Sequence, residues 1–562
     1  MIVSTGFFHG RQGMWPRRRL LRTAGVTGAW LASMMASNTG HAETQPVVFP
    51  DYPFKLGVAS GDPLQDGVVL WTKLATEPLA ADGHGGIPPL PIPVRWEVAE
   101  DERFRRVVAR GVEQTGPNLG HSVHAEVSGL RPERSYFYRF RAGSEISPVG
   151  RTRTAPAAHN QPATLRFAQA SCQHVPHGFY TAYQHMAQQD LDLVVFLGDY
   201  IYEGPAQGSL GRGHQPPIEI SALAEYRVRY GQYRSEPELQ AVHASFPWLV
   251  VWDDHELDSD WADEVPSDGQ PIADFLRRRA AAFQVYYEFM PLRSTSIAQG
   301  IDLQLFRRIH WGRLATFHLL DTRQYRDAQV CGGGFADCPE AFDPTRSILG
   351  ADQESWLIDG FQRSTARWDI LAQQVVFARR LVEREGILTT RMDAWDGYVA
   401  SQERITEGWI DAGVRNPIVL SGDVHAHWAT DLKLDYLDPA AETVGSELVT
   451  TSITTDGNGE DSFGDHPIFA DNPHLRFYTN LRGYVTITIT PEHLAADLQC
   501  VRRVTEPGAE VFTRASFVVD DGVRGLRQTL DRPPTPDEAR RLPDRTREEA
   551  IRALIAKETA DP

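Results

Sequence analysis

The fold is decided by the stretch Leu193-Val194-Val195-Phe196-Leu197-Gly198-Asp199-Tyr200-Ile201-Tyr202. Its apolar first half is typical of a buried strand, and the glycine and carboxylate that follow turn the backbone out of the core. In open α/β sheets the functional groups lie at such strand ends. Asp199 and Tyr202 therefore offer a carboxylate and a phenolate, two hard oxygen donors suited to a divalent or trivalent cation. The alternative is that Asp199 caps a helix and Tyr202 belongs to the core.

The apolar run that precedes this stretch has a cysteine at its end. Residues 165–170 stop at Ser171-Cys172-Gln173, and a short helical pattern separates the two runs. Strand, helix and strand at this spacing predict a βαβ unit, in which Cys172 and Asp199 emerge at the same edge of neighbouring strands. A thiolate beside a carboxylate and a phenolate suits a metal pocket. Taken alone, Cys172 is more typical of a core cysteine.

A further apolar run, residues 246–252, is followed by four titratable residues, Asp253, Asp254, His255 and Glu256. Four such groups at a strand end are costly to hold in place unless cations or solvent receive them. A solvated acidic turn is the alternative to a metal site.

The third strand of this type covers residues 416–420 and leads into Asp423, His425 and His427. Alternate residues of an extended segment share a face, so both imidazoles are expected to point to one side, where neutral nitrogens can ligate a metal together. A His-x-His pair alone also occurs in structural roles. Three strands that end in metal-competent residues are hard to explain by packing, and we therefore expect a metal-dependent hydrolase.

Composition places the chain among ordinary globular proteins with room for more than one domain. It has 562 residues, of which 41% are hydrophobic and 23% charged, and its net charge is -18. Residues 1–42 contain five arginines and no acid, so the rest has 51 basic against 74 acidic side chains, a net charge of -23. This excess argues against a nucleic-acid backbone as partner. An acidic enzyme can still act on a phosphate ester if bound cations invert the local field.

The first 42 residues have the organisation of an export signal. Arg17-Arg18-Arg19-Leu20-Leu21-Arg22 precedes a moderately apolar run and the small residues of a cleavage site at Gly40-His41-Ala42. The paired arginines followed by leucines resemble a twin-arginine signal, and a Sec signal is the alternative. No later segment reaches transmembrane length without charges. We expect an exported protein, periplasmic or secreted, whose partner is the twin-arginine export machinery.

The four cysteines fit an oxidising compartment. Cys331 and Cys338 flank a short glycine-rich interval, and a disulfide that closes this loop is the simplest interpretation. Cys172 and Cys500 are then unpaired, and Cys500 is typical of a small buried hydrophobe.

Residues 43–155 contain short alternating strands broken by Gly and Pro, a pattern of antiparallel sandwiches that resembles a fibronectin type III domain. Residues 163–515 form the predicted α/β catalytic domain, and residues 516–562 form a helical tail. In the tail, Ala550, Ile551, Leu554 and Ile555 make an apolar stripe that is expected to dock on the body, with a lid or an interface as the weaker alternative.

Seven ordered motifs between about residues 45 and 515 resemble the PhoD-like alkaline phosphatase family, within the calcineurin-like metallophosphoesterases. The tyrosine three residues after Asp199 is also similar to purple acid phosphatases, where such a tyrosine binds ferric iron. The matching motifs are FKLGVASGDP (54–63), ASC (170–172), GDYIYE (198–203), WDDHE (252–256), LDTRQYR (320–326), GADQESWL (350–357) and SGDVHAHW (421–428).

The resemblance implies that the catalytic domain is a metallophosphoesterase-like α/β sandwich with two central sheets. It also implies an exported phosphomonoesterase and phosphodiesterase that holds one Fe(3+) together with Ca(2+). It assigns Cys172 and Tyr202 to iron and Asp199 to a bridge between iron and calcium. The chain departs from the family pattern near the calcium site. It has Asp258-Ser259-Asp260 where the family usually has an asparagine that binds calcium, so Ser259 or Asp260 would have to take the place of that ligand. The remaining metal ligands that the resemblance implies are Asp254, Asp423, His425 and His427.

Two further residues are candidates for catalysis. His255 is the candidate general acid for the leaving group. Arg323 could clamp phosphate bidentately, and a salt bridge to Asp321 or Asp327 is an equally good alternative.

We expect a monomer that acts on small phosphate esters by metal-assisted in-line attack. A diesterase acting on phospholipid or cell-wall polymers, similar in substrate to phospholipase D, is the first rival. A binding protein that sequesters phosphate or calcium without turnover is the second.

Overall fold

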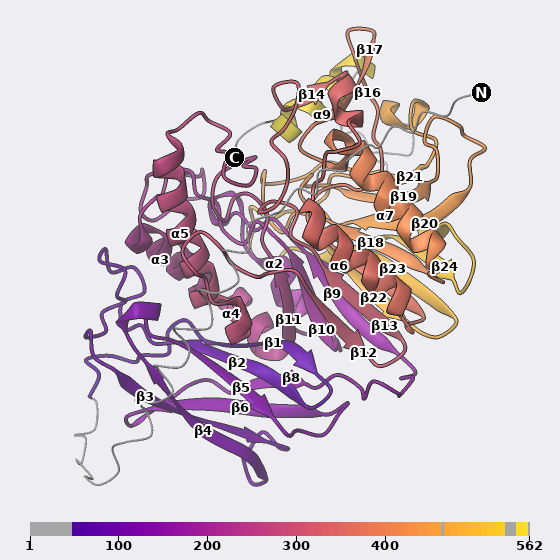
Figure 1. The fold of residues 1–562 in the computed structure, drawn as a ribbon. Coiled ribbons are helices and arrows are strands. Elements are labelled where there is room, and N and C mark those ends of the chain that lie inside the picture. The colour runs from indigo at the N-terminus through magenta and orange to yellow at the C-terminus, as the bar shows by residue number, and fades with distance from the viewer. Residues whose placement is uncertain (1–47, 462–465, 534–546, 560–562) are drawn as a thin grey trace, which may run out of the picture. The chain divides into compact units, whose positions relative to one another are not determined.

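Two β-sheets form the centre of the fold (Figure 1). The computed structural model describes residues 48–461, 466–533 and 547–559, and the signal predicted for residues 1–42 lies outside them. The first sheet has ten strands in the order β25-β24-β23-β22-β9-β10-β11-β1-β2-β5. These strands are β1 (Val58–Leu64), β2 (Gly67–Lys73), β5 (Ser122–Ser128), β9 (Leu165–Ala170), β10 (Leu193–Leu197), β11 (Pro247–Val251), β22 (Gly483–Ile489), β23 (His493–Val501), β24 (Val511–Asp520) and β25 (Arg527–Asp531).

The predicted βαβ unit lies in the middle of this sheet. Strands β9, β10 and β11 are parallel neighbours, and helix α2 (Thr181–Met186) connects the first two. All five residues of β10 and of β11 are buried, as expected of parallel strands that are covered on both faces. The carboxyl ends of these strands therefore share one edge, as the sequence predicted.

The second sheet has seven strands in the order β12-β13-β15-β18-β20-β19-β21. Gln169 on β9 connects the two sheets, because its side-chain amide donates to the carbonyls of Ser421 and Leu448 at 2.8 and 3.0 Å. The strands are β12 (Arg307–Trp311), β13 (Ala315–Leu319), β15 (Trp368–Ala372), β18 (Pro417–Ser421), β19 (His427–Lys433), β20 (Thr443–Val449) and β21 (Leu475–Thr479).

Helices cover the outer faces of the two sheets (Figure 1). Tyr230 of α3, Val242 of α4 and Phe283 of α5 pack in the core of the first sheet. Leu357 of α6 and Trp409 of α7 pack in a separate core against the second sheet. The helices are α3 (Leu223–Arg234), α4 (Pro237–Ser245), α5 (Ile272–Phe289), α6 (Gly350–Arg363), α7 (Val399–Asp411) and α9 (Arg547–Thr559).

The N-terminal β-rich segment is shared between two sheets. Strand β1 pairs in parallel with β11, so β1, β2 and β5 continue the ten-stranded sheet. The other strands of the segment form a five-stranded sheet: β3 (Ile92–Ala99), β4 (Val107–Thr115), β6 (Ser135–Ala142), β7 (Glu145–Ile146) and β8 (Gly150–Arg153).

Two smaller predictions are confirmed near the C-terminal helix. Cys331 and Cys338 form a disulfide, and Cys172 and Cys500 are free and buried. Helix α9 docks through buried Ile551 and Leu554. A three-stranded sheet lies beside it, formed by β14 (Phe335–Ala336), β16 (Val382–Arg384) and β17 (Ile387–Arg391). None of the described helices is both long and apolar enough to span a bilayer.

Candidate metal centre

The ends of β9 and β10 form the base of the site. The Cys172 amide donates to the Gly198 carbonyl at 3.0 Å, which holds the two turns side by side. Cys172 and Asp199 both have positive φ, 58° and 57°, so each strand turns sharply out of the sheet there. Gly198 has φ 106°, and a Cβ atom on it would lie 2.5 Å from Asp253 Cβ. Only glycine therefore lets the end of β10 approach the end of β11 this closely.

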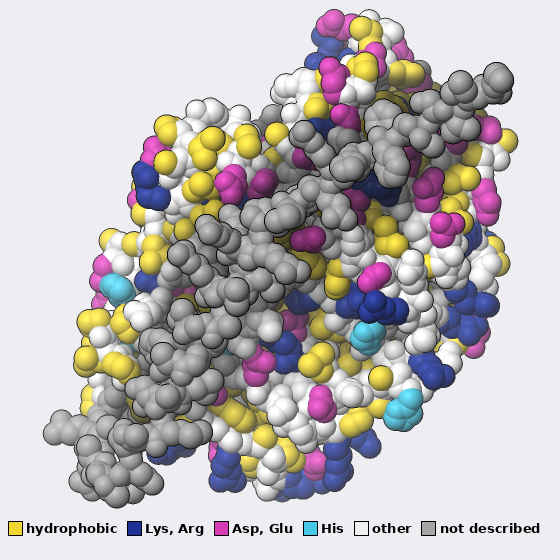
Figure 2. Space-filling view, in the orientation of Figure 1, with side chains coloured by type: hydrophobic (Ala, Val, Ile, Leu, Met, Phe, Trp, Pro, Cys, Tyr) yellow, Lys and Arg dark blue, Asp and Glu magenta, His cyan; other side chains and the backbone are white. Residues whose placement is uncertain are grey.

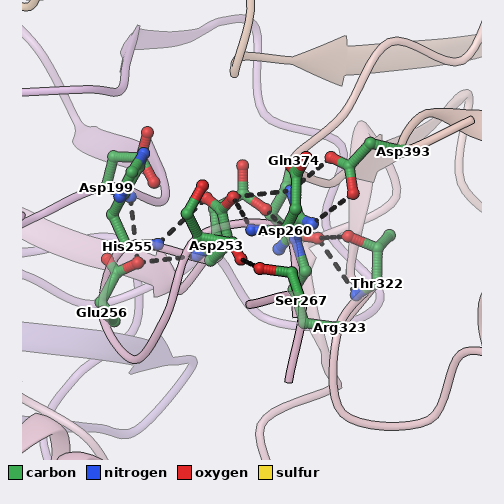
Figure 3. Close-up of polar contacts among 12 residues, drawn as sticks. Asp199, Asp253, His255, Glu256, Asp260, Ser267, Thr322, Arg323, Gln374 and Asp393 are labelled. Carbon is green, nitrogen blue, oxygen red and sulfur yellow. Dashed lines mark hydrogen bonds and ion pairs between the residues drawn. The ribbon is translucent and has the colours of Figure 1, made fainter. Parts of the chain in front are cut away.

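Glu256 ties these turns together. One of its oxygens accepts from the amides of Asp199 and Asp253 at 3.1 and 2.9 Å, and the other accepts from the Tyr200 amide at 2.7 Å (Figure 3). Burial raises the pKa of Glu256 to about 7, although the hydrogen bonds from these backbone amides lower it. This residue is the last of the acidic run in the sequence, and its role is to position the backbone.

One group of donors gathers around Asp199. The ligand atoms of Cys172, Asp199 and His425 all lie within 4.8 Å of one another. Tyr202 Oη donates to Asp199 Oδ2 at 3.0 Å and lies 3.4 Å from His425 Nε2. Sulfur, carboxylate, phenol and imidazole donors from three separate segments thus meet at one place.

A second group extends this site towards β11. Asp199, Asp254 and His255 also place their ligand atoms within 4.8 Å of one another. Asp199 therefore belongs to both groups, as expected of a ligand that would bridge two cations. Its Oδ1 atom is buried and has no hydrogen-bond partner among the described residues. A buried carboxylate oxygen without a partner is costly, and a cation would satisfy it.

The electrostatics of the first group fit a cation. Burial raises the pKa values of the Cys172 thiol and the Tyr202 phenol well above their ordinary values, and the Asp199 carboxylate raises both further. Burial also raises the pKa of Asp199 itself well above its usual range. A bound cation would reverse these shifts, because it stabilises the ionised form of each ligand.

His255 is held by a carboxylate on the far side of its ring. Its Nδ1 lies 2.7 Å from Glu203 Oε2, and both side chains are buried. Burial alone would lower the pKa of His255, but Glu203, Asp254 and Asp199 together raise it well above its ordinary value. The contact with Glu203 therefore holds the ring in one orientation.

His425 has a carboxylate partner that the sequence analysis missed. Its Nδ1 lies 2.9 Å from Asp456 Oδ2, in a loop between β20 and β21. The neighbouring Thr455 donates through its hydroxyl to Tyr202 Oη at 2.8 Å. No motif in the sequence marks this loop, because Asp456 and Thr455 act on the site from a segment with no strand or helix of its own.

The expected geometry of the paired histidines is wrong. Asp423 and His425 have positive φ, 68° and 49°, so the backbone is not extended before β19 begins at His427. His425 turns towards Tyr202, whereas His427 Nδ1 accepts from the Thr451 amide at 3.3 Å.

Asp423 and His427 lie outside the compact donor groups. Among the described residues, neither belongs to a group of three whose ligand atoms lie within 4.8 Å of one another. Burial raises the pKa of Asp423 to about 7 and lowers the pKa of His427 to about 3. A fully buried His427 therefore stays neutral.

Arg323 is fully buried and binds carboxylates (Figure 3). Its Nε donates to Asp253 at 2.5 Å, and its two terminal nitrogens donate to Asp393 at 2.8 and 3.0 Å. Asp321 accepts instead from the Arg323 backbone amide at 3.0 Å. The geometry thus favours the salt-bridge alternative, with partners other than those expected from the sequence.

Two other donor groups are weaker candidates. Asp254, Asp260 and Asp393 also lie within 4.8 Å of one another, but Arg323 and Arg326 already compensate the charge of Asp393. Cys331, Cys338 and Glu340 form the remaining group, and its cysteines are joined in the disulfide.

Comparisons with known proteins show that this chain is similar to phosphatases. The sequence model described as PhoD-like phosphatase matches residues 167–498, and the one described as PhoD-like phosphatase, N-terminal domain, matches residues 40–156. Alkaline phosphatase D of Bacillus subtilis (strain 168) is 47% identical over 520 residues, which cover 91% of this chain and 89% of that protein. A solved structure of PhoD is 46% identical, covers 91% of this chain and 100% of its own, and superposes with a TM-score of 0.84.

Proposed function

The chain belongs to the PhoD-like phosphatase family and is a phosphatase, and from this premise we propose that it is an exported, metal-dependent enzyme that hydrolyses phosphate monoesters and diesters. The observation that carries the proposal is the convergence of Cys172, Asp199, Tyr202 and His425, with Asp199 Oδ1 left without a partner. Family membership also weighs against the alternative of a protein that only sequesters phosphate or calcium.

The donor chemistry divides the site in two. Thiolate and phenolate suit Fe(3+), so Cys172 and Tyr202 would hold iron, and Asp199 would bridge to the second group. The second group offers carboxylate oxygens, which suit Ca(2+), and we assign Asp254 to it. Asp423, His425 and His427 complete the proposed ligand set. For His427 the support is its full burial at the start of β19, with Nε2 lacking a hydrogen-bond partner among the described residues. For Asp423, which is half-buried, the support is its place directly after β18.

Bound cations would supply positive charge that polarises the phosphoryl oxygens and offsets the charge of the transition state. His255 would give its proton to the leaving alkoxide, since Glu203 holds the ring through Nδ1 and leaves Nε2 to donate. Asp456 would position His425 in the same manner.

Arg323 has a different proposed role from a phosphate clamp. Because its three guanidinium nitrogens bind Asp253 and Asp393, we assign it the task of holding the turn that contains Asp254. Arg323→Lys would then lower stability and metal affinity together, since a point charge cannot reproduce the bidentate contact.

Export by the twin-arginine pathway is the proposed route, supported by the arginine pair and apolar run within residues 1–42. Periplasmic or secreted location follows from it. The disulfide between Cys331 and Cys338 is consistent with an oxidising compartment.

Rates on matched chromogenic substrates test the proposal. Purified protein should hydrolyse an aryl phosphate and a bis-aryl phosphate, and a strong chelator should abolish both activities until metal is restored. Activity on the diester alone would favour the rival diesterase that acts on phospholipid or cell-wall polymers. Full activity in metal-free protein would contradict the proposal.

A further inference from the structure

Arg482 is a buried cation beside the first donor group, and neither the sequence motifs nor the proposed mechanism uses it. Figure 2 shows many Lys and Arg side chains at the surface, where water solvates their charge. Arg482 is only 2% exposed and comes directly before β22. A guanidinium stays protonated in proteins, so a buried one needs partners that compensate for the loss of water.

The hydrogen-bond partners of Arg482 belong to two segments that reach the site. Its Nη1 donates to the His425 carbonyl at 2.5 Å and to Ser452 Oγ at 3.2 Å. Its Nε donates to the Gly457 carbonyl at 2.8 Å. One side chain therefore joins the segment of His425 to both ends of residues 452–457, which we call the 452–457 loop.

The 452–457 loop supplies the two residues that orient proposed metal ligands, Thr455 and Asp456. It has no strand or helix of its own, so contacts with its neighbours determine its shape. Because Arg482 binds the first and the last residue of the loop, a displacement of Arg482 would displace both of these residues.

Arg482 also holds the backbone of His425 in an uncommon conformation. His425 has φ 49°, a left-handed value that a non-glycine residue keeps only where its surroundings hold it. Its carbonyl accepts from Arg482 and from the Thr451 hydroxyl, the latter at 3.1 Å. These two bonds stabilise the turn that directs the His425 ring towards Tyr202.

The charge of Arg482 is only partly neutralised. Its three hydrogen bonds go to uncharged oxygens, and its one ion-pair partner in the described part of the chain is Asp456, whose Oδ2 lies 3.9 Å from Nη2. The same Oδ2 atom also contacts His425 Nδ1 at 2.9 Å. Cys172 and Tyr202 both lie close enough to interact with the guanidinium charge. A buried cation beside them favours the thiolate and the phenolate, the forms that bind a metal.

We propose that Arg482 is a positioning residue of the metal centre. Its hydrogen bonds fix His425 and the 452–457 loop, and its charge favours the ionised sulfur and phenol ligands. The inference rests on the proposed function, because these are the ligands of the proposed iron. The two contributions can be separated, since lysine keeps the charge without the fork of donors and glutamine keeps neither.

Iron titration of metal-depleted protein, with Fe(3+) supplied as its citrate complex, tests the proposal. Arg482→Gln should bind iron roughly 10- to 100-fold more weakly than the wild type, as expected when a residue that orients metal ligands is removed. Arg482→Lys should have an affinity between those of the wild type and Arg482→Gln. The visible band of the ferric phenolate should shift in Arg482→Gln and lie near its wild-type position in Arg482→Lys, because lysine restores the charge.

Arg514→Gln is the matched control. Arg514 is equally buried, at 2% exposed, but its Nε donates to Asp461 at 2.6 Å. This variant should have a lower melting temperature, whereas its iron affinity and its visible band should equal those of the wild type. Melting temperatures of all metal-depleted proteins measure how far each substitution affects the fold itself.

Wild-type affinity in Arg482→Gln, or an equal loss of affinity in Arg514→Gln, would overturn the inference alone. If Arg482→Gln does not fold, Arg482→Lys decides: weaker binding with the wild-type band supports the inference, and wild-type affinity overturns it. No iron binding by the wild type would overturn the inference and the proposed function together. If the wild type binds iron, Arg482→Gln loses it and the wild type does not cleave p-nitrophenyl phosphate, the inference stands and the proposed function fails.

Discussion

Tyr202 Oη lies 3.0 Å from Asp199 Oδ2 within the single turn that follows β10. The pair is local in sequence, but its orientation is not, because Thr455 donates to the same phenol oxygen from 253 positions away. The site therefore depends on the local turn after β10 and also on a distant loop, which contains Thr455 and reaches the site only when the chain folds.

The thiol and phenol can be tested as iron ligands. Cys172→Ser and Tyr202→Phe should each lose most of the bound iron, and Tyr202→Phe should also lose the visible absorption expected of a ferric phenolate. Elemental analysis and absorption spectra measure both. Cys500→Ser is the matched control, since Cys500 is also free and buried but lies in β23. Full iron content in both site variants would rule out the assignment.

Asp456 is expected to position His425. Asp456→Asn keeps the shape of the side chain but removes its charge, so metal affinity or activity should fall by roughly 10- to 100-fold. Metal titration measures the affinity, and thermal unfolding of the same sample shows whether the fold is intact. Asp461→Asn serves as control, because Asp461 bonds Arg514 and Thr479 instead. Equal metal affinity in Asp456→Asn and the wild type would contradict the positioning role.

Gly198 is expected to be irreplaceable for steric reasons. In Gly198→Ala the new Cβ atom would lie 2.5 Å from Asp253 Cβ at a backbone φ of 106°. The free energy of unfolding should fall by at least about 2 kcal/mol. In the control, Gly211→Ala, φ is 69° and the added atom meets no neighbour within 4 Å, so the loss should be about 1 kcal/mol. Denaturation midpoints measure the stability of both variants. Equal losses in Gly198→Ala and Gly211→Ala would show that the ends of β10 and β11 do not approach each other tightly.

His243 is expected to make stability depend on pH. It is fully buried, its ring stacks on Trp248 at 3.7 Å, and burial together with Arg234 lowers its pKa well below the ordinary value. In the unfolded chain this group takes up a proton near pH 6.5, whereas the folded protein does not. Protonation therefore favours unfolding, and the free energy of unfolding falls as the pH drops below about 6.5.

Melting temperatures between pH 8 and pH 5 measure this contribution. His243→Gln should be less stable at pH 8 but should lose less stability on acidification than the wild type. His159→Gln, which removes an exposed histidine, should lose as much melting temperature between pH 8 and pH 5 as the wild type does. If His243→Gln also loses as much as the wild type, another group is responsible for the pH dependence.

The sequence predicted the parts of the site that follow from strand order. Cys172 and Asp199 lie together because β9 and β10 are consecutive parallel strands, and such neighbours end at one edge. The disulfide and the apolar stripe of α9 were predicted for equally local reasons.

What could not be predicted depends on long-range packing. His425 departs from the period of two because its φ is 49°, a left-handed value that no residue type in the motif signals. Its partner Asp456 comes from a loop without a motif, and the pairing of Arg323 with Asp393 joins residues 70 positions apart. The parallel pairing of β1 with β11 is likewise a contact between distant segments.

The most direct test of the account is anomalous X-ray scattering from crystals of the active protein, measured on both sides of the iron absorption edge. We expect an iron peak within bonding distance of Cys172 Sγ, Tyr202 Oη and an Asp199 oxygen. An active preparation whose anomalous map has no peak between these three atoms would contradict the central claim.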